Sequence, residues 1–308
     1  MNKVIVIAGP TASGKTDLAI KLAHEINGEI ISADSMQIYR GMDIGTAKPT
    51  MEERQGIPHY LIDIVDPDEE YSVAHFQRDA KNCIKEILNR GKVPIVAGGT
   101  GLYINSLVYN INFSETTADW EYRKQLEEIA RDKGPEELHR FLQKVDPVSA
   151  EKIHPNNIKR VIRALEVFKT TGKPISQHQL ESRTEKPEYE FKIFGLEMDR
   201  KILYERINKR VDKMMEIGLY EEVESLLEKY SPDLVSLQGI GYKEIISAIK
   251  GEYSLEEAVE KIKLNTRHLA KRQITWFKKT ENLRWIDTGN TETRAIIKKL
   301  ANNLNNGY

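Results

Sequence analysis

A phosphate-binding loop near the start of the chain constrains its fold more than any other feature. In the stretch VIVIAGPTASGKTDLAIKLA, residues 4–23, a continuous apolar run leads into the pattern G-x-x-x-x-G-K-[ST] and then into a helical pattern. Such an apolar run is typical of a strand buried on both faces of a parallel sheet. The sequence therefore predicts a strand, a glycine-rich loop and a helix whose first turn faces a phosphate group.

The residues of this loop form the predicted site for a diphosphate or nucleotide. They are Gly9, Pro10, Thr11, Ala12, Ser13, Gly14, Lys15 and Thr16. The glycines let backbone N–H groups point at phosphate oxygens, Lys15 adds a positive charge, and the Thr16 hydroxyl is a candidate ligand for Mg²⁺, the cofactor that we expect. A triphosphatase usually also has a strand that ends in an Asp for the Mg²⁺ water. The strand VPIVAGG ends in glycines instead, which makes a simple ATPase less well supported than the loop alone suggests.

Apolar segments alternate with helical patterns, and this alternation predicts an α/β fold with a parallel sheet flanked by helices. The strands are expected at residues 4–8, 29–35, 59–67, 93–99, 190–198 and 283–287. Ser72 is a candidate cap for a helix that follows the third strand. Because ligands bind beyond the carboxyl ends of parallel strands, we expect Gly9, Asp34 and the segment 98–100 to lie close together.

The pattern changes over residues 114–187, where helical periodicity continues without a convincing strand. We interpret this segment as an inserted all-helical subdomain, and residues 1–113 and 188–308 as one α/β core. Two long amphipathic helices are expected in the second part of the core, over 201–230 and 254–279.

Composition and charge limit the class of protein and its surroundings. The net charge is −1 and 40% of the residues are hydrophobic, but no apolar run approaches the roughly 20 residues that a membrane span needs. The single cysteine, Cys83, falls on the apolar stripe of a predicted helix and permits no internal disulfide, which fits a reducing cytoplasm. Neither the His spacing nor the lone Cys predicts structural zinc. We expect a cytoplasmic monomer that does not bind a membrane.

Positive charge is concentrated near the C-terminus although the chain is almost neutral overall. The segment 261–280 contains no Asp or Glu, and its basic residues are Lys261, Lys263, Arg267, Lys271, Arg272, Lys278 and Lys279. Their spacing places Arg267, Lys271 and Lys278 on one helix face. This segment is typical of a surface that contacts nucleic-acid phosphates.

Five stretches occur together and in order: GPTASGKT, ADSMQIYRGMDIGTAKP, AGGTGLY, KRVIRALE and TRHLAKRQITWF. Together they resemble the bacterial tRNA dimethylallyltransferases, also called tRNA isopentenyltransferases, over nearly the whole chain. The resemblance implies a P-loop NTPase-like core. It also implies transfer of the dimethylallyl group from dimethylallyl diphosphate to N6 of adenosine 37 in the tRNA anticodon stem-loop, giving N6-isopentenyladenosine. The loop would then hold a prenyl diphosphate, although the same motif is widely described as an ATP site.

The resemblance also implies roles for individual residues. Asp34 would be the general base, Thr100 would lie near the adenine at the catalytic site, and Arg210 would touch the diphosphate. The resemblance and the basic stretches together predict tRNA contacts at Asp34, Ser35, Met36, Gln37, Thr100, Arg123, Lys159, Arg160, Val161, Ile162, Arg163, Lys243, Arg267, Lys271 and Arg272.

Two other functions stay open on the residues alone. In a P-loop small-molecule kinase that uses ATP, Asp34 would be the base for a substrate hydroxyl, but the basic segment 261–280 would be unexplained. An RNA-binding protein with a nucleotide switch would need a base-reading motif such as NKxD, which the sequence lacks.

Overall fold

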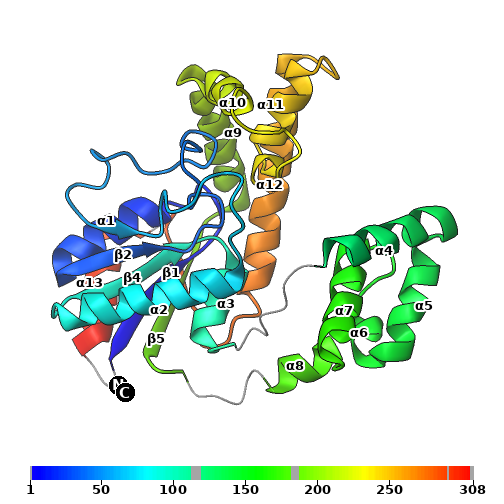
Figure 1. The fold of residues 1–308 in the computed structure, drawn as a ribbon. Helices are drawn as coiled ribbons and strands as arrows, with labels where there is room; N and C mark the ends of the chain where they lie inside the picture. The colour runs from blue at the N-terminus through cyan, green and yellow to red at the C-terminus, as the bar shows by residue number, and fades with distance from the viewer. Residues whose placement is uncertain (1, 112–118, 182–186, 290, 306–308) are drawn as a thin grey trace. The chain divides into compact units, whose positions relative to one another are not determined.

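The computed structural model describes residues 2–111, 119–181, 187–289 and 291–305. The chain divides into two compact units (Figure 1). The core unit comprises Met1–Val108 and Glu188–Tyr308, and the helical unit comprises Tyr109–Pro187. The predicted start of the insertion at residue 114 lies outside the described residues.

Within the described residues, the core unit contains one six-stranded sheet in which all neighbours pair in parallel. The order is β3-β2-β4-β1-β5-β6. The strands are β1 (Lys3–Ala8), β2 (Gly28–Ser32), β3 (His59–Tyr60), β4 (Val93–Gly98), β5 (Glu190–Glu197) and β6 (Arg284–Asp287). The predicted parallel α/β sheet is therefore confirmed.

The third strand is much shorter than the predicted span 59–67, since β3 has only two residues. Leu61 and Asp63 have φ angles of 60° and 57°, a left-handed conformation that a strand cannot continue through. The apolar residues after β3 are therefore packed as a loop, and Ile64 and Val65 donate their N–H groups to Ile38.

Helices cover both faces of the sheet in the core unit. They are α1 (Lys15–Ile26), α2 (Val73–Asn89), α3 (Gly101–Val108) and α13 (Thr293–Asn305). Ile5 and Ile7 of β1 join a buried cluster with α1 and α13, whereas α2 lies in front of the sheet in Figure 1. The predicted Ser72 cap is confirmed by its side chain accepting from the His75 N–H. Cys83 in α2 is half-buried, so it lies at the margin of the core.

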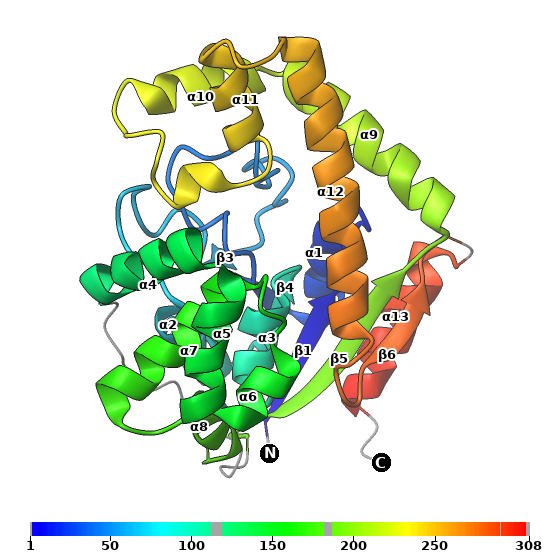
Figure 2. The same cartoon turned by 90° about the vertical axis from the view of Figure 1, so that its right-hand side faces the viewer.

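A second group of helices follows β5: α9 (Arg200–Glu216), α10 (Leu219–Leu227), α11 (Tyr242–Ile249) and α12 (Leu255–Phe277), with a 3₁₀ turn at Ser236–Gln238. The predicted single helix over 201–230 is wrong. Gly218 takes a φ of 102°, which breaks the helical ladder between α9 and α10. In Figure 2, α12 runs the length of the core unit.

The helical unit contains α4 (Trp120–Lys133), α5 (Pro135–Val145), α6 (Pro147–Lys152), α7 (Ile158–Thr171) and α8 (Ile175–Glu181), and no strand occurs among its described residues. An apolar cluster that includes Leu138, Leu142 and Val161 forms its own core. Within the part of the chain that the structure describes, none of the helices combines the length with the apolar composition that a membrane span requires.

Candidate active site

Three segments far apart in the sequence meet at the carboxyl edge of the sheet. The phosphate loop follows β1, Asp34 follows β2, and Thr100 follows β4, and these strands lie side by side in the order β2-β4-β1. A Cβ atom at Gly98 would lie 2.2 Å from the Ala33 carbonyl oxygen, so only glycine permits this close approach of β2 and β4. The structure thus brings the predicted loop, base and threonine to one edge.

Contacts among its own residues shape the phosphate loop. Gly14 caps α1 in the left-handed conformation, with a φ of 88°, which turns the chain into the first helical turn. The Lys15 Nζ reaches back and donates to the Pro10 carbonyl at 2.6 Å. The Ser13 hydroxyl is buried without a hydrogen-bond partner in the described structure. The loop therefore presents a cation and polar groups suited to phosphate oxygens.

Burial and the nearby positive charge of Arg210 together lower the pKa of Lys15 to about 8, against the opposing effect of the Asp34 carboxylate. Arg210 itself is desolvated, which lowers its pKa, and the charges of Asp34 and Glu53 oppose that effect. The Arg210 Nη1 donates to the Thr11 hydroxyl at 3.3 Å. Two cations therefore share a desolvated site at the loop, a site that a diphosphate would neutralise.

Asp34 lies in a turn that Thr100 holds in place. The Asp34 Oδ1 accepts from the Met36 N–H at 2.9 Å. The Thr100 Oγ1 accepts from the Ser35 N–H at 3.0 Å and lies 3.3 Å from the Ser35 hydroxyl, to which it donates. Asp34 is half-buried, and among the described residues its other carboxylate oxygen accepts no hydrogen bond, as a proton acceptor requires.

Gln37 and Met36, both predicted tRNA contacts, are tied into the core unit. The Gln37 Oε1 accepts from the Ser32 hydroxyl at 3.0 Å, and its Nε2 donates to the Thr46 and Ala47 carbonyls, each at 3.3 Å. A Cβ at Gly239 would lie 2.6 Å from the Met36 methyl carbon, which shows how tightly Met36 is packed. These contacts give both side chains a bracing role, and their contact with tRNA stays a prediction.

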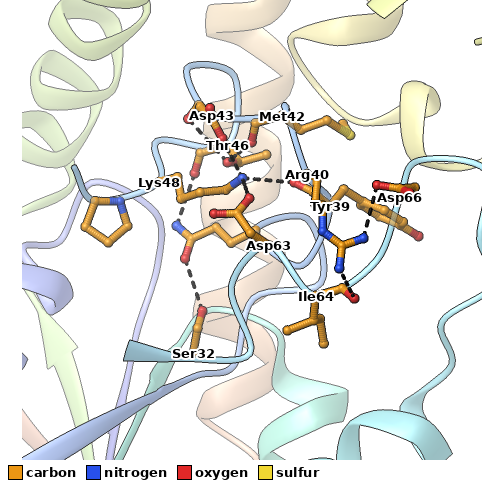
Figure 3. Close-up of polar contacts among 12 residues, drawn as sticks. Ser32, Tyr39, Arg40, Met42, Asp43, Thr46, Lys48, Asp63, Ile64 and Asp66 are labelled. Atoms are coloured by element: carbon orange, nitrogen blue, oxygen red, sulfur yellow. Dashed lines mark hydrogen bonds and ion pairs between the residues drawn. The ribbon is translucent and has the colours of Figure 1, made fainter. Parts of the chain in front are cut away.

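Lys48, which the sequence did not single out, organises the loop after Asp34 (Figure 3). Its side chain is only 4% exposed, and its Nζ donates to the Tyr39 carbonyl at 2.9 Å and to Asp43 at 2.5 Å, and also to Asp63. A buried cation is stable only when it is paired in this way. Lys48 therefore fixes the loop that runs beside the phosphate site.

A cavity of about 610 Å³ lies between the phosphate loop, the segment 43–55 and α9. Its walls include five cationic side chains, Lys15, Lys48, Arg206, Arg210 and Lys213, together with the acidic Asp17, Asp43 and Glu53. The cations exceed the acids, so the cavity suits an anionic ligand. Lys213 was not among the residues singled out from the sequence. Its position three residues after Arg210, on the same helix face, is the pattern that could have indicated it.

Several cations of the basic segment on α12 already form ion pairs or hydrogen bonds within the protein. Lys261 pairs with Glu257, and Lys263 pairs with Asp212 of α9. Arg267 donates to Asn208 at 2.7 Å, whereas Lys271 and Arg272 are exposed. On α11, Lys243 lies 3.7 Å from Glu244. Lys271 and Arg272 therefore retain the clearest phosphate-binding potential on α12.

In the helical unit, Arg123 forms a two-bond pair with Glu166, at 2.8 and 2.9 Å, and Arg163 donates to the same carboxylate at 2.6 Å. Burial of Glu166 opposes ionisation, but hydrogen bonds from the two arginines lower its pKa below the usual range. Arg123 and Arg163 thus hold the unit together, and their contact with tRNA stays a prediction.

The structure limits how Val161 and Ile162 could take part in the predicted tRNA contacts. These side chains are 0% and 3% exposed and belong to the apolar cluster of the helical unit. Buried side chains cannot supply such a contact, so any contact at these two positions would come from the backbone and stays a prediction. The exposed cations beside them on α7 are Lys159 and Arg160, and these residues carry the prediction for this helix.

A family model described as IPP transferase matches residues 37–280 of this chain. The tRNA dimethylallyltransferase of Acetivibrio thermocellus is 60% identical over 302 residues, covering 97% of this chain and 96% of that protein. The tRNA dimethylallyltransferase of Bacillus mycoides is 52% identical over 303 residues, covering 98% and 95%.

Solved structures agree in fold and family. The tRNA isopentenylpyrophosphate transferase of Bacillus halodurans has a TM-score of 0.74 and 46% identity, covering 99% of this chain and 96% of that one. A eukaryotic dimethylallyltransferase acting on tRNA has a TM-score of 0.81 and 33% identity, covering 100% and 81%. These neighbours have a P-loop NTPase-like fold, as does the core unit. With the motif spacing, the site geometry and the family match in agreement, this chain belongs to the IPP transferase family.

Proposed function

We propose that this protein transfers a dimethylallyl group from dimethylallyl diphosphate to N6 of adenosine 37 in the anticodon stem-loop of tRNA, and that it acts as a monomer. The enzyme class follows from the family and from relatives named tRNA dimethylallyltransferase: the chain is a tRNA-modifying prenyltransferase, and the small-molecule kinase is set aside. The proposal concerns the position of the target base and the roles of the site residues.

The observation that carries the proposal is the meeting of a carboxylate and an anion site at one sheet edge. The charge of Asp34 acts to raise the pKa of both Lys15 and Arg210, so the three groups lie within electrostatic range. A prenyl diphosphate held by the loop would place its allylic carbon beyond the loop, toward the strand ends where Asp34 lies.

The chemistry needs residues of these types. The N6 amine is a weak nucleophile because its lone pair is delocalised into the ring, and a base that takes its proton contributes about 10²- to 10⁴-fold in rate. Negative charge builds on the diphosphate as the bond to the allylic carbon breaks. The loop amides, Lys15 and Arg210 would stabilise that charge. The adenine is normally stacked, so it has to be extruded to reach the site.

Thr16 fits as a protein ligand for a magnesium ion held mainly by the substrate. Its hydroxyl lines the cavity beside Lys15, and the described residues contain no cluster of three or more His, Cys, Asp or Glu side chains that could hold a metal. Mg²⁺ characteristically combines one or two protein oxygens with phosphate oxygens and water. The bound ion would neutralise charge on the diphosphate.

The test is to incubate the pure protein with unmodified tRNA, Mg²⁺ and dimethylallyl diphosphate, then to digest the tRNA and weigh its nucleosides. A parallel reaction holds ATP in place of the prenyl donor. An adenosine heavier by one five-carbon prenyl unit, at position 37 and only with the prenyl donor, is expected. Prenylation at another position, or consumption of ATP without prenylation, would contradict the proposal.

A further inference from the structure

One side chain on α12 contacts two separate loops of the active site. The Gln273 Oε1 accepts from the Thr11 N–H at 2.8 Å, and its Nε2 donates to the Gly99 carbonyl at 3.0 Å. These partners lie 262 and 174 positions away along the chain. Gln273 is half-buried, and both ends of its amide are therefore used within the protein.

The first of these loops is the one that holds the diphosphate in the proposed reaction. Thr11 lies in the middle of the phosphate loop, and its hydroxyl accepts from Arg210 at 3.3 Å. Its backbone N–H is the group that Gln273 binds. Thr11 is thus held from α9 on one side and from α12 on the other.

The second loop positions the proposed base. Gly99 precedes Thr100, whose hydroxyl accepts from the Ser35 N–H, and whose own N–H donates to Ala33 at 3.1 Å. Ser35 and Ala33 flank Asp34 on either side. The carbonyl that Gln273 binds is therefore one residue from the group that fixes the Asp34 turn.

A larger residue at position 99 would have to displace the amide of Gln273. A Cβ atom at Gly99 would lie 2.3 Å from the Gln273 Nε2, far inside van der Waals contact. Its next neighbour outside Gln273 would be the Gly9 carbonyl oxygen, at an ordinary 3.5 Å. The amide of Gln273 thus occupies the space that a side chain at position 99 would need.

We infer that Gln273 is a positioning residue for group transfer, which sets the separation between the diphosphate loop and the Asp34 turn. It acts through Thr11 and Gly99 and does not itself touch the reacting atoms. The inference rests on the proposed function, because the two loops carry the donor and the base only in that reaction. Since reacting atoms must lie within a few tenths of an ångström of the productive geometry, a shift of either loop lowers the rate of the chemical step more than substrate binding.

The first experiment replaces the amide by an isosteric carboxylate, Gln273→Glu. The variant keeps an acceptor for Thr11 but places a carboxylate oxygen against the Gly99 carbonyl, which pushes the second loop away. We expect kcat for tRNA prenylation to fall by about 10- to 100-fold, with KM for both substrates changed less than about twofold. An unchanged kcat, or an effect confined to KM, would overturn the inference.

Asn265→Asp is the matched control. Asn265 is a half-buried amide on the same helix, and its Nδ2 donates to Glu244 of α11 at 2.7 Å, so the substitution makes the same amide-to-acid change away from both loops. It is expected to lower the melting temperature and to leave kcat within about twofold of wild type. An equal loss of kcat in both variants would mean that general weakening of α12 causes the effect, and would overturn the inference.

A double-mutant cycle tests the contact itself. Gly99→Ala should lower kcat by about 10-fold in the wild-type background, because the new methyl group displaces the Gln273 amide from Thr11 and Gly99. In a Gln273→Ala background, which has no such amide to displace, it should lower kcat by less than about twofold. If the effects of the two substitutions on kcat are additive, the inference that this contact matters is overturned. Melting temperatures from the same four proteins report the coupling without any assay of activity. If wild type forms no prenylated tRNA while the melting temperatures still couple, the proposed function has failed and the contact has not.

Discussion

At the scale of single residues, the phosphate loop owes its chemistry to two cations that the fold forces close together. Lys15 has a lowered pKa because it is buried and because Arg210 is near, and its Nζ is held by the Pro10 carbonyl. A ligand of opposite charge would reverse both causes, since it pairs with Lys15 and separates it from the charge of Arg210. Lys15 in the free protein therefore changes charge in a pH range where activity can be measured.

The pH dependence of donor capture follows from this pKa of about 8. As the pH rises through it, the free protein loses the Lys15 charge, and kcat/KM for dimethylallyl diphosphate should fall. Lys15→Arg, which stays charged, should show no such decline. Rates at limiting donor concentration from pH 7 to 9.5 check this, and a flat wild-type profile would contradict it.

The same shift links Lys15 to stability. The folded-state pKa is depressed, so between about pH 8 and 10.5 the unfolded chain binds the extra proton. The contribution of Lys15 to the free energy of unfolding therefore rises with pH across that window. In denaturant titrations, Lys15→Met should flatten this rise relative to wild type, whereas a rise of the same steepness would count against the shift.

Asp34 is the residue whose loss should separate chemistry from binding. Asp34→Asn keeps the side-chain oxygen that accepts from the Met36 N–H but removes the basic carboxylate. We expect kcat to fall by about 100-fold or more with the dissociation constant for tRNA unchanged. Single-turnover rates and filter binding measure the two quantities, and an unchanged kcat would remove Asp34 as the base.

At the scale of elements, the loop between β2 and β3 is shaped by one carboxylate from α10. Glu222 accepts from the N–H groups of Asp43, Ile44 and Gly45 at 3.0, 2.6 and 3.1 Å, and from the Tyr242 hydroxyl at 2.7 Å. These bonds turn the loop toward the cavity, where Asp43 and Ile44 form part of the wall. The loop conformation is thus imposed from a helix far away in the sequence.

Glu222→Gln tests this arrangement. The substitution replaces one acceptor oxygen by an NH₂ group that faces donors, and it should lower the free energy of unfolding by about 1–3 kcal/mol and raise KM for the donor. Tyr242→Phe removes a single bond of the same group and should cost only about 0.5–1.5 kcal/mol. Chemical denaturation measures both, and a cost for Glu222→Gln no larger than that for Tyr242→Phe would contradict the account.

At the scale of the whole molecule, exposed cations occur on both units. Lys271 and Arg272 lie on α12 of the core unit, and Lys159 and Arg160 lie on α7 of the helical unit. Exposed cations bind RNA phosphates whatever the RNA sequence. If tRNA contacts both units, its affinity should therefore depend on both pairs of cations. The buried Val161 beside the second pair keeps that helix in place.

Salt dependence of tRNA binding distinguishes contact by both units from contact by one. Replacing either pair by alanine should weaken binding and reduce the slope of log affinity against log salt by roughly 1–2. Lys133→Ala and Lys298→Ala, which change exposed cations outside the predicted contact set, should leave the slope unchanged. If the helical-unit pair alters neither affinity nor slope, that unit does not contact the tRNA phosphates.

The sequence by itself determined the features that depend on short stretches of neighbouring residues. The apolar run before Gly9, the spacing from Gly14 to Thr16 and the alternation of strands and helices predicted a parallel sheet with a phosphate loop, and the topology confirms that sheet. Strand ends on neighbouring parallel strands must meet at one edge, so the proximity of Asp34 and Thr100 to the loop followed as well. Local patterns specify these features because strand, loop and helix preferences act over a few residues.

Only the tertiary structure decided which side chains share surfaces across long stretches of chain. Gln273 of α12 binds the phosphate loop across 262 positions, and Glu222 of α10 binds the loop after β2 across up to 179 positions. No local sequence pattern encodes such pairings. Likewise, only the structure shows that the Val161 side chain is buried, although the helix that contains it is basic. The physical reason is that hydrogen bonds and burial depend on which surfaces meet once the chain has folded, whereas a sequence motif records only order along the chain.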